Sequence, residues 1–126
     1  MTKQVRACQE LWAQNKYLVL SKSQKIYLRI REYLKTEAPE LAVLEAYIDQ
    51  AQAMPEDRGQ VINAYQHVWG YFKNRATDQE KADFIKLLSA YQKGEASQED
   101  LAQAVKDLLD IYPNTYLERS SLLDKS

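Results

Sequence analysis

Apolar side chains recur at helical spacing through residues 58–75, RGQVINAYQHVWGYFKNR, and this stretch constrains the fold more than any other. Val61, Tyr65, Val68 and Phe72 are three or four residues apart, so on a helix they would form one apolar stripe. Such a stripe has to be buried against other elements. We therefore expect a helix over residues 58–75 with one side in a hydrophobic core.

The same helix would carry a second, more polar face. Asn63, His67, Gly70 and Tyr71 follow i, i+4, i+7, i+8 spacing, and His67 is the single histidine of the chain. A glycine inside a helix costs about 1 kcal/mol relative to alanine, so Gly70 indicates that a backbone or a ligand approaches closely there. We expect this face to make contacts, and a small-molecule pocket beneath Gly70 is a weaker alternative.

The rest of the chain also favours helices. Glycine and proline occur only three times each, and 45% of the residues are hydrophobic, as in an ordinary globular protein. We predict an all-α fold, a compact single-domain bundle of about six helices over residues 1–126. The expected helices cover residues 3–20, 22–35, 39–54, 58–75, 77–91 and 97–109, with a short seventh turn within 115–123.

Several residues predict where these helices begin and end. Ser23 is a suitable N-cap for the second helix, and Thr77 with Glu80 three residues later forms a capping-box pattern. Ser97 begins the sixth helix in the same way. Gly94 occupies the position after the fifth helix where glycine is favoured.

The lone cysteine and the hydropathy pattern limit the class of protein. Cys8 excludes an intramolecular disulfide and a cysteine-built zinc or iron–sulfur site within one chain, and it is expected to act as a small apolar filler. No run of 18 apolar residues occurs, and the first residues do not resemble a secretory signal. We expect a cytoplasmic protein without membrane association.

Charge is distributed unevenly along the chain. Residues 1–35 hold eight basic and two acidic side chains, a net +6, whereas the other 91 residues hold nine basic and sixteen acidic ones, a net −7. Such asymmetry indicates either a surface for an anionic partner or two solvated faces that attract each other within the fold.

The sequence offers no catalytic or metal site. Nucleophilic catalysis by Cys8 would need His67 as its base, and nothing in the sequence brings the two together. His67 also lacks a second metal-ligand side chain at helical spacing, since positions 63 and 64 are Asn and Ala. We therefore predict a non-catalytic protein with no cofactor and no metal.

Nucleic-acid contact is the first hypothesis, because cations bind phosphates and flat side chains stack on bases. The predicted contact residues combine cations that would capture the polyanion with three side chains for local contacts: Lys16, Lys22, Lys25, Arg29, Arg58 and Lys73, followed by Asn63, His67 and Tyr71.

Three stretches carry a resemblance to a known family. They are LWAQNKYLVLSKSQKIYLRI, MPEDRGQVINAYQHVWGYFKN and YPNTYLERSSLL, and the central one, with Arg-Gly, Asn and His-x-x-Gly-Tyr-Phe-Lys, is the most specific. On these motifs the chain resembles the YbgA-like family, a bacterial all-helical domain classed as of unknown function. It departs from the family pattern at Asn15, where the family often has histidine.

The resemblance implies a partner and a ligand. In some relatives this domain is fused behind a cysteine-rich iron–sulfur domain that removes sulfur from thiolated uracil or from thiouridine in transfer RNA. The helical part looks like the substrate-binding half of such fusions. The resemblance thus implies a module that binds RNA, with transfer RNA favoured, or that works with a separately encoded iron–sulfur desulfidase.

A second hypothesis places a partner protein, or a second copy of the chain, on the same motif face. Trp, Tyr and Arg on a helical face also suit protein-interaction hot spots. A third interpretation needs no ligand, because a hydrogen-bonded network of Asn63, His67 and Tyr71 could fix the helix register.

Overall fold

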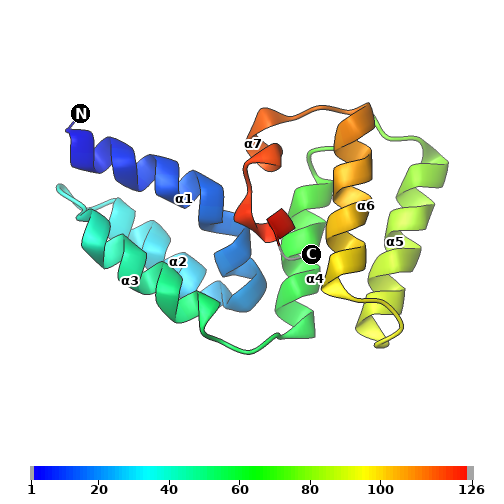
Figure 1. Cartoon of the computed structure of the whole chain (residues 1–126), viewed down its shortest axis with the longest axis horizontal. Coiled ribbons are helices and arrows are strands. Elements are labelled where there is room, and N and C mark those ends of the chain that lie inside the picture. Colours follow the sequence, from blue (N-terminus) through cyan, green and yellow to red (C-terminus); the bar gives the residue numbers. More distant parts are fainter. Residues whose placement is uncertain (1, 125–126) are drawn as a thin grey trace.

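The computed structural model describes residues 2–124 and confirms the all-α prediction (Figure 1). Within these residues the chain forms seven α-helices and one 3-10 helix and no strand. The elements are α1 (Lys3–Lys22), α2 (Gln24–Leu34), α3 (Leu41–Gln52), α4 (Arg58–Trp69), α5 (Asp78–Gln92), α6 (Gln98–Ile111), α7 (Thr115–Glu118) and η1 (Ser121–Asp124).

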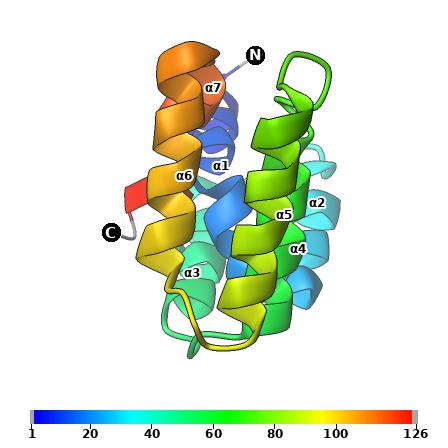
Figure 2. The same ribbon diagram turned by 90° about the vertical axis from the view of Figure 1, so that its right-hand side faces the viewer.

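Helix α1 is the central element because it packs against helices on both sides. α2 and α3 pack against α1 at one end of the molecule, whereas α4, α5 and α6 occupy the other end, where α5 and α6 run side by side (Figures 1 and 2). The side chains of α1 accordingly point into two separate cores. Cys8 and Val19 belong to the core shared with α2 and α3, and Tyr17 and Leu20 to the core shared with α4 and α6.

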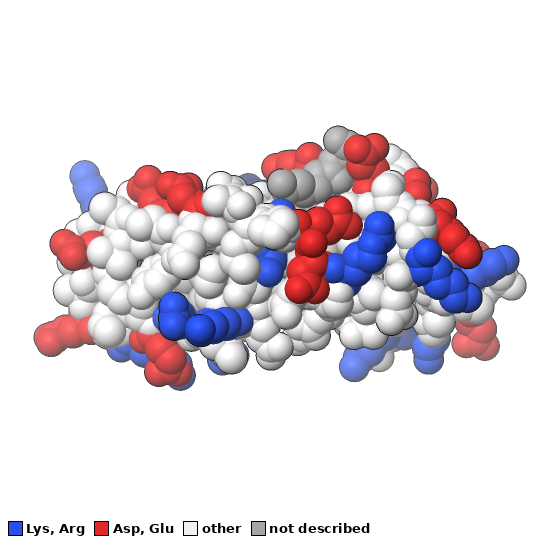
Figure 3. All heavy atoms as spheres, turned by 90° about the horizontal axis from the view of Figure 1, so that it is seen from below, with Lys and Arg blue, Asp and Glu red and all other residues white. Residues whose placement is uncertain are grey.

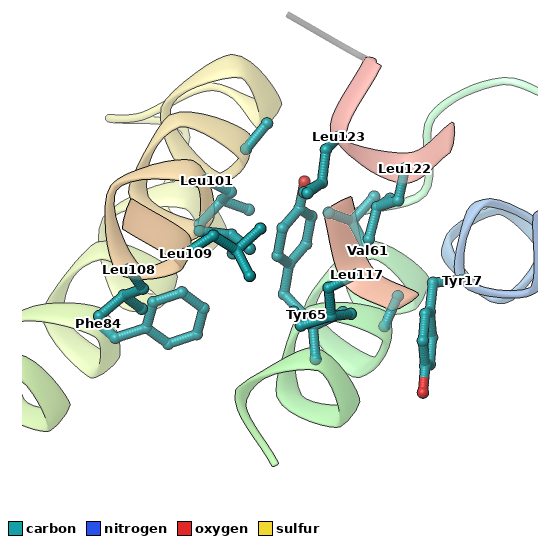
Figure 4. Close-up of a cluster of buried hydrophobic side chains, with 14 of the residues drawn as sticks. Tyr17, Val61, Tyr65, Phe84, Leu101, Leu108, Leu109, Leu117, Leu122 and Leu123 are labelled. Carbon is teal, nitrogen blue, oxygen red and sulfur yellow. The ribbon is translucent and has the colours of Figure 1, made fainter. Parts of the chain in front are cut away.

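The larger core is built around Tyr65 of α4. Tyr65 is 0% exposed, and its ring lies between Leu101 of α6 and the C-terminal leucines, with its hydroxyl directed toward Leu123 (Figure 4). This hydroxyl has no hydrogen-bond partner among the described residues. Burial raises the pKa of Tyr65 above its ordinary value, so the group stays protonated.

The C-terminal segment folds back onto the bundle. The predicted single turn within 115–123 is two elements, α7 and η1, and η1 packs against α1 and α6. The Ser121 hydroxyl donates to Asn15 Oδ1 at 2.7 Å, and Asn15 Nδ2 donates to the Leu11 carbonyl at 3.0 Å. Asn15 is only 9% exposed, so it has a structural role that joins the C-terminal segment to α1.

The predicted caps are confirmed because they depend only on local sequence. Ser23 accepts a hydrogen bond from the Ile26 amide at 3.1 Å, and the capping boxes that begin at Thr77 and Ser97 are both complete. Gly94 follows α5 with a φ of 80°, a conformation that side chains other than glycine rarely adopt. The third helix begins at Leu41, two residues after Pro39, close to the predicted start.

The prediction of one helix over residues 58–75 is wrong beyond Trp69. Gly70 and Tyr71 donate their amides to the His67 and Val68 carbonyls, at 3.1 and 3.0 Å, which tightens the chain into successive turns. Gly70 is therefore the C-cap of α4 and not a residue of its interior. A Cβ at this position would lie 3.1 Å from the His67 carbonyl oxygen, so the close approach involves the backbone of the same segment.

Candidate functional site

Tyrosine side chains from three helices and the turn after α4 meet where the two halves of the molecule join. The hydroxyls of Tyr17 and Tyr71 are 2.8 Å apart, and their rings meet edge to face at 6.1 Å between centroids. Tyr116 of α7 stacks on Tyr71 at 6.2 Å with only 14° between the ring planes. Tyr27 of α2 packs against the same core. We call Tyr17, Tyr27, Tyr71 and Tyr116 the tyrosine cluster.

Two cations and an indole border the tyrosine cluster. The Lys16 ammonium lies 5.5 Å from the centre of the Tyr17 ring, and the Arg31 guanidinium lies 5.9 Å from that of Tyr27. Trp12 of α1 packs on Tyr27 at 5.5 Å between ring centroids. The cluster thus combines one buried and three half-buried aromatic rings with positive charge.

Tyr17 and Tyr116 of the cluster stay protonated near neutral pH. Burial raises the pKa of Tyr17 far above its ordinary value of 10.0, and the hydrogen bond with Tyr71 raises it further. Burial and the neighbouring Tyr71 also raise the pKa of Tyr116. Neutral phenols that cannot ionise readily are suited to stacking and hydrogen bonding, not to proton abstraction.

The three stretches that carry the family resemblance converge on this cluster. The first supplies Tyr17 and Tyr27, the second Tyr71, and the third Tyr116. These stretches are far apart in the sequence, so their contact is a property of the fold. The sequence-based site omitted Tyr17, Tyr27 and Tyr116, although each lies in a quoted motif.

The predicted contact face of the central motif is divided by the end of α4. Asn63 and His67 lie on α4, half-buried and exposed respectively, whereas Tyr71 lies in the turn beyond it and packs into the tyrosine cluster. Within residues 2–124, no hydrogen bond joins the side chains of Asn63, His67 and Tyr71. The described structure therefore does not contain the three-residue network considered as an alternative.

Two of the predicted cations have partners within the chain. Lys22 donates to the Met54 carbonyl at 2.9 Å, which ties the end of α1 to the segment after α3. Arg58 donates to the Tyr91 carbonyl at 2.6 Å, and its guanidinium lies 4.6 Å from the centre of the Tyr91 ring. Both groups are already engaged in holding elements together.

The remaining predicted cations lie on α1, on α2 and in the turn after α4. Lys25 and Arg29 are exposed on α2, where they line a groove with Tyr33 and Tyr47, and Lys73 is exposed in the turn after α4. On the face seen from below, acidic and basic side chains are interspersed without a continuous basic area (Figure 3). Of the predicted residues, the structure links Lys16 and Tyr71 through Tyr17, and it places Lys25 and Arg29 on the same groove.

A cavity of about 480 Å³ opens beside the tyrosine cluster, between α1 and α7. Tyr116 belongs to both, since it stacks on Tyr71 and also lines the cavity. The other lining residues are Glu10, Ala13, Gln14, Thr115 and Arg119.

Within residues 2–124, the His, Cys, Asp and Glu side chains do not gather in groups of three or more that could hold a metal ion. Over the same residues, none of the helices combines the length and the apolar character needed to cross a bilayer. Cys8 is fully buried, its thiol lies 3.8 Å from the Pro39 carbonyl oxygen, and burial raises its pKa.

Comparison with known proteins identifies one family. No curated protein and no solved structure shows a significant match to the chain. One family model matches residues 16–125, and its description is "Protein of unknown function (DUF1722)". This match includes all the residues of the tyrosine cluster. Because it covers most of the chain, the protein belongs to the DUF1722 family.

Proposed function

We propose that this protein is a non-catalytic RNA-binding module that binds through the tyrosine cluster. The observation that carries the proposal is the convergence of tyrosines from three helices and the turn after α4, bordered by Lys16 and Arg31. RNA-binding proteins commonly stack unpaired bases on aromatic rings, while cations beside them bind the phosphates.

The structure leads us to divide the predicted residues by role. Tyr71 belongs to the tyrosine cluster and Lys16 borders it. Exposed His67 and Lys73 are close to Tyr71 in the sequence, so these residues form the main contact set together with half-buried Asn63. Exposed Lys25 and Arg29 on α2 would bind phosphates further along the RNA. We give Lys22 and Arg58 a structural role in place of RNA contact, because the side chain of each donates a hydrogen bond to a backbone carbonyl.

The resemblance to the YbgA-like family favours transfer RNA as the ligand. We infer that the DUF1722 family and the YbgA-like family are the same group, since the match over residues 16–125 includes the central motif. The module would then present RNA to a separately encoded iron–sulfur desulfidase. A buried Cys8, alone in the chain, cannot supply a cluster, so the iron–sulfur chemistry would belong to that partner.

A mobility-shift titration against total transfer RNA at two salt concentrations tests the proposal. Binding should weaken with roughly one power of salt for each phosphate neutralised. Lys16→Glu should weaken binding at both concentrations. Lys86→Glu makes the same change on exposed α5, at the other end of the molecule, and should leave binding unchanged. Failure of the wild-type protein to bind any RNA at low salt would refute the proposal.

The protein-interaction alternative gives a different result in the same samples. A stable homodimer or partner complex that is insensitive to salt and lost in Tyr71→Ala would support an adaptor using this face. Size-exclusion chromatography with light scattering measures that outcome directly.

A further inference from the structure

We propose that the cavity between α1 and α7 binds one unpaired guanine base. This inference rests on the proposed function, since the base would belong to the bound RNA. Six residues line the cavity: Glu10, Ala13, Gln14, Thr115, Tyr116 and Arg119. Its volume of about 480 Å³ is within the range of roughly 300–1,000 Å³ typical of small-ligand pockets.

An aromatic wall gives the cavity its preference for a flat ligand. Tyr116 lines it, and Tyr71 packs nearly parallel to the Tyr116 ring, 14° between planes. Tyr71 is in turn held by Tyr17, 2.8 Å between their hydroxyls. Tyr116 is therefore backed by other rings, so it offers a pre-positioned surface on which a base can stack.

The polar groups of the cavity are free for a ligand. Within residues 2–124, the side chains of Glu10, Gln14, Thr115 and Arg119 make no hydrogen bond and no ion pair. Glu10 lies on α1 and Arg119 is the C-cap of α7, so an acceptor and a donor are presented from two separate parts of the chain that line the cavity. Neither charge is neutralised by the other, since no ion pair joins them within 4.0 Å.

Guanine matches this pair better than the other bases do. Its Watson–Crick edge has two adjacent donors, N1–H and the N2 amino group, which a carboxylate such as Glu10 can accept together. Its other edge has the O6 and N7 acceptors that arginine binds in bidentate fashion. Adenine has only its N6 amino group as a donor, and in cytosine the donor and the acceptors share one edge. A guanine between Glu10 and Arg119 would use both charged groups.

The same recognition chemistry could select a free guanine nucleotide, so the test includes both. Guanosine, adenosine, cytidine and uridine monophosphates are titrated into the isotope-labelled protein, and amide shifts are followed by NMR. Guanosine monophosphate should shift the amides of Ala13, Gln14 and Thr115 to Arg119, and the other three nucleotides should bind at least about tenfold more weakly. Transfer RNA binding is measured in parallel by mobility shift.

Two exposed-site substitutions test the named groups. Glu10→Gln and Arg119→Gln should each weaken guanosine monophosphate binding by about tenfold, and Glu10→Gln should reduce the preference over adenosine monophosphate. Glu118→Gln is the matched control, because Glu118 is the neighbour of Arg119 on α7, is exposed and does not line the cavity. It should leave nucleotide binding unchanged.

The outcomes separate the two proposals. If transfer RNA binds but no nucleotide shifts the cavity amides, or all four shift them equally, the guanine site is wrong and the proposed function stands. If guanosine monophosphate binds as expected but no RNA does, the proposed function is wrong and the cavity is a site for free nucleotide. If RNA binding is present and weakens in Glu10→Gln, with the control unchanged, the base belongs to RNA.

Discussion

The hydroxyl oxygens of Tyr17 and Tyr71 are 2.8 Å apart although 54 residues separate them in the chain. Tyr17 is only 5% exposed, so its hydroxyl depends on this partner. Tyr71→Phe should therefore lower the free energy of unfolding by about 1–3 kcal/mol, the cost of a buried polar group without a partner. Urea denaturation followed by circular dichroism measures this loss.

The double variant Tyr17→Phe/Tyr71→Phe provides the check on this prediction. Because both hydroxyls are removed, it should be less destabilised than the sum of the two single variants. Tyr47→Phe serves as a control, since its hydroxyl makes no hydrogen bond within residues 2–124. Strict additivity of the two single changes would mean that the pair does not interact.

Tyr65→Phe should have the opposite effect. The Tyr65 hydroxyl is buried without a hydrogen-bond partner among the described residues, so removing it relieves a desolvation cost. We expect the free energy of unfolding to rise by about 1 kcal/mol, with the ring packing retained. Thermal unfolding monitored by calorimetry gives the comparison. A loss of stability would show that this oxygen is bonded in solution.

The contribution of Glu56 to the free energy of unfolding is expected to depend on pH. The hydrogen bond from the Tyr91 hydroxyl is the main cause that lowers the pKa of this carboxyl below its ordinary 4.5. The ionised carboxylate therefore stabilises the folded state. This stabilisation is complete above pH 4.5 and is lost as the pH falls through the pKa that Glu56 has in the folded protein.

Glu56→Gln should consequently cost about 1 kcal/mol or less at neutral pH, because the pair is partly exposed. The difference from wild type should disappear in acid, well below 4.5. Urea midpoints measured across this range provide the comparison. If the difference in stability between Glu56→Gln and wild type did not change with pH, the ionised Glu56 would not be the stabilising form.

Arg58→Met should separate structural cations from binding cations. Loss of the hydrogen bond to the Tyr91 carbonyl and of the contact with the Tyr91 ring should lower the free energy of unfolding by about 1–2 kcal/mol. Transfer RNA affinity, measured by mobility shift on the folded variant, should change little. Lys16→Met should show the reverse pattern. A large loss of affinity in Arg58→Met without loss of stability would return Arg58 to the binding set.

Features that depend on local sequence could be predicted. The capping boxes at Thr77 and Ser97 each involve residues three positions apart, and the left-handed Gly94 follows from one residue at a helix end. Gly70 was placed in a helix interior because periodicity continues through Phe72. The spacing of apolar residues does not distinguish an α-helix from successive turns, because both can direct the same side chains into the core.

Features that depend on contacts between distant segments could not be predicted. Arg58 appeared free to bind phosphate because its partner, the Tyr91 carbonyl, is 33 residues away and belongs to the backbone. Tyr71 was expected at a surface for its chemistry, but its partners Tyr17 and Tyr116 lie on α1 and α7. The three stretches that carry the family resemblance contain all four tyrosines of the cluster, but their sequence does not indicate that these side chains are in contact.

Because α1 supplies Cys8 to one core and Tyr17 to the other, neither half of the molecule has a complete interior without it. Unfolding of α2 and α3 would expose the Cys8 side of α1. Because Tyr17 lies nine residues after Cys8 on the same helix, the packing around Tyr17 would be destabilised as well. The chain should therefore lose its structure in a single cooperative step, and any RNA held at the junction would stabilise both ends at once.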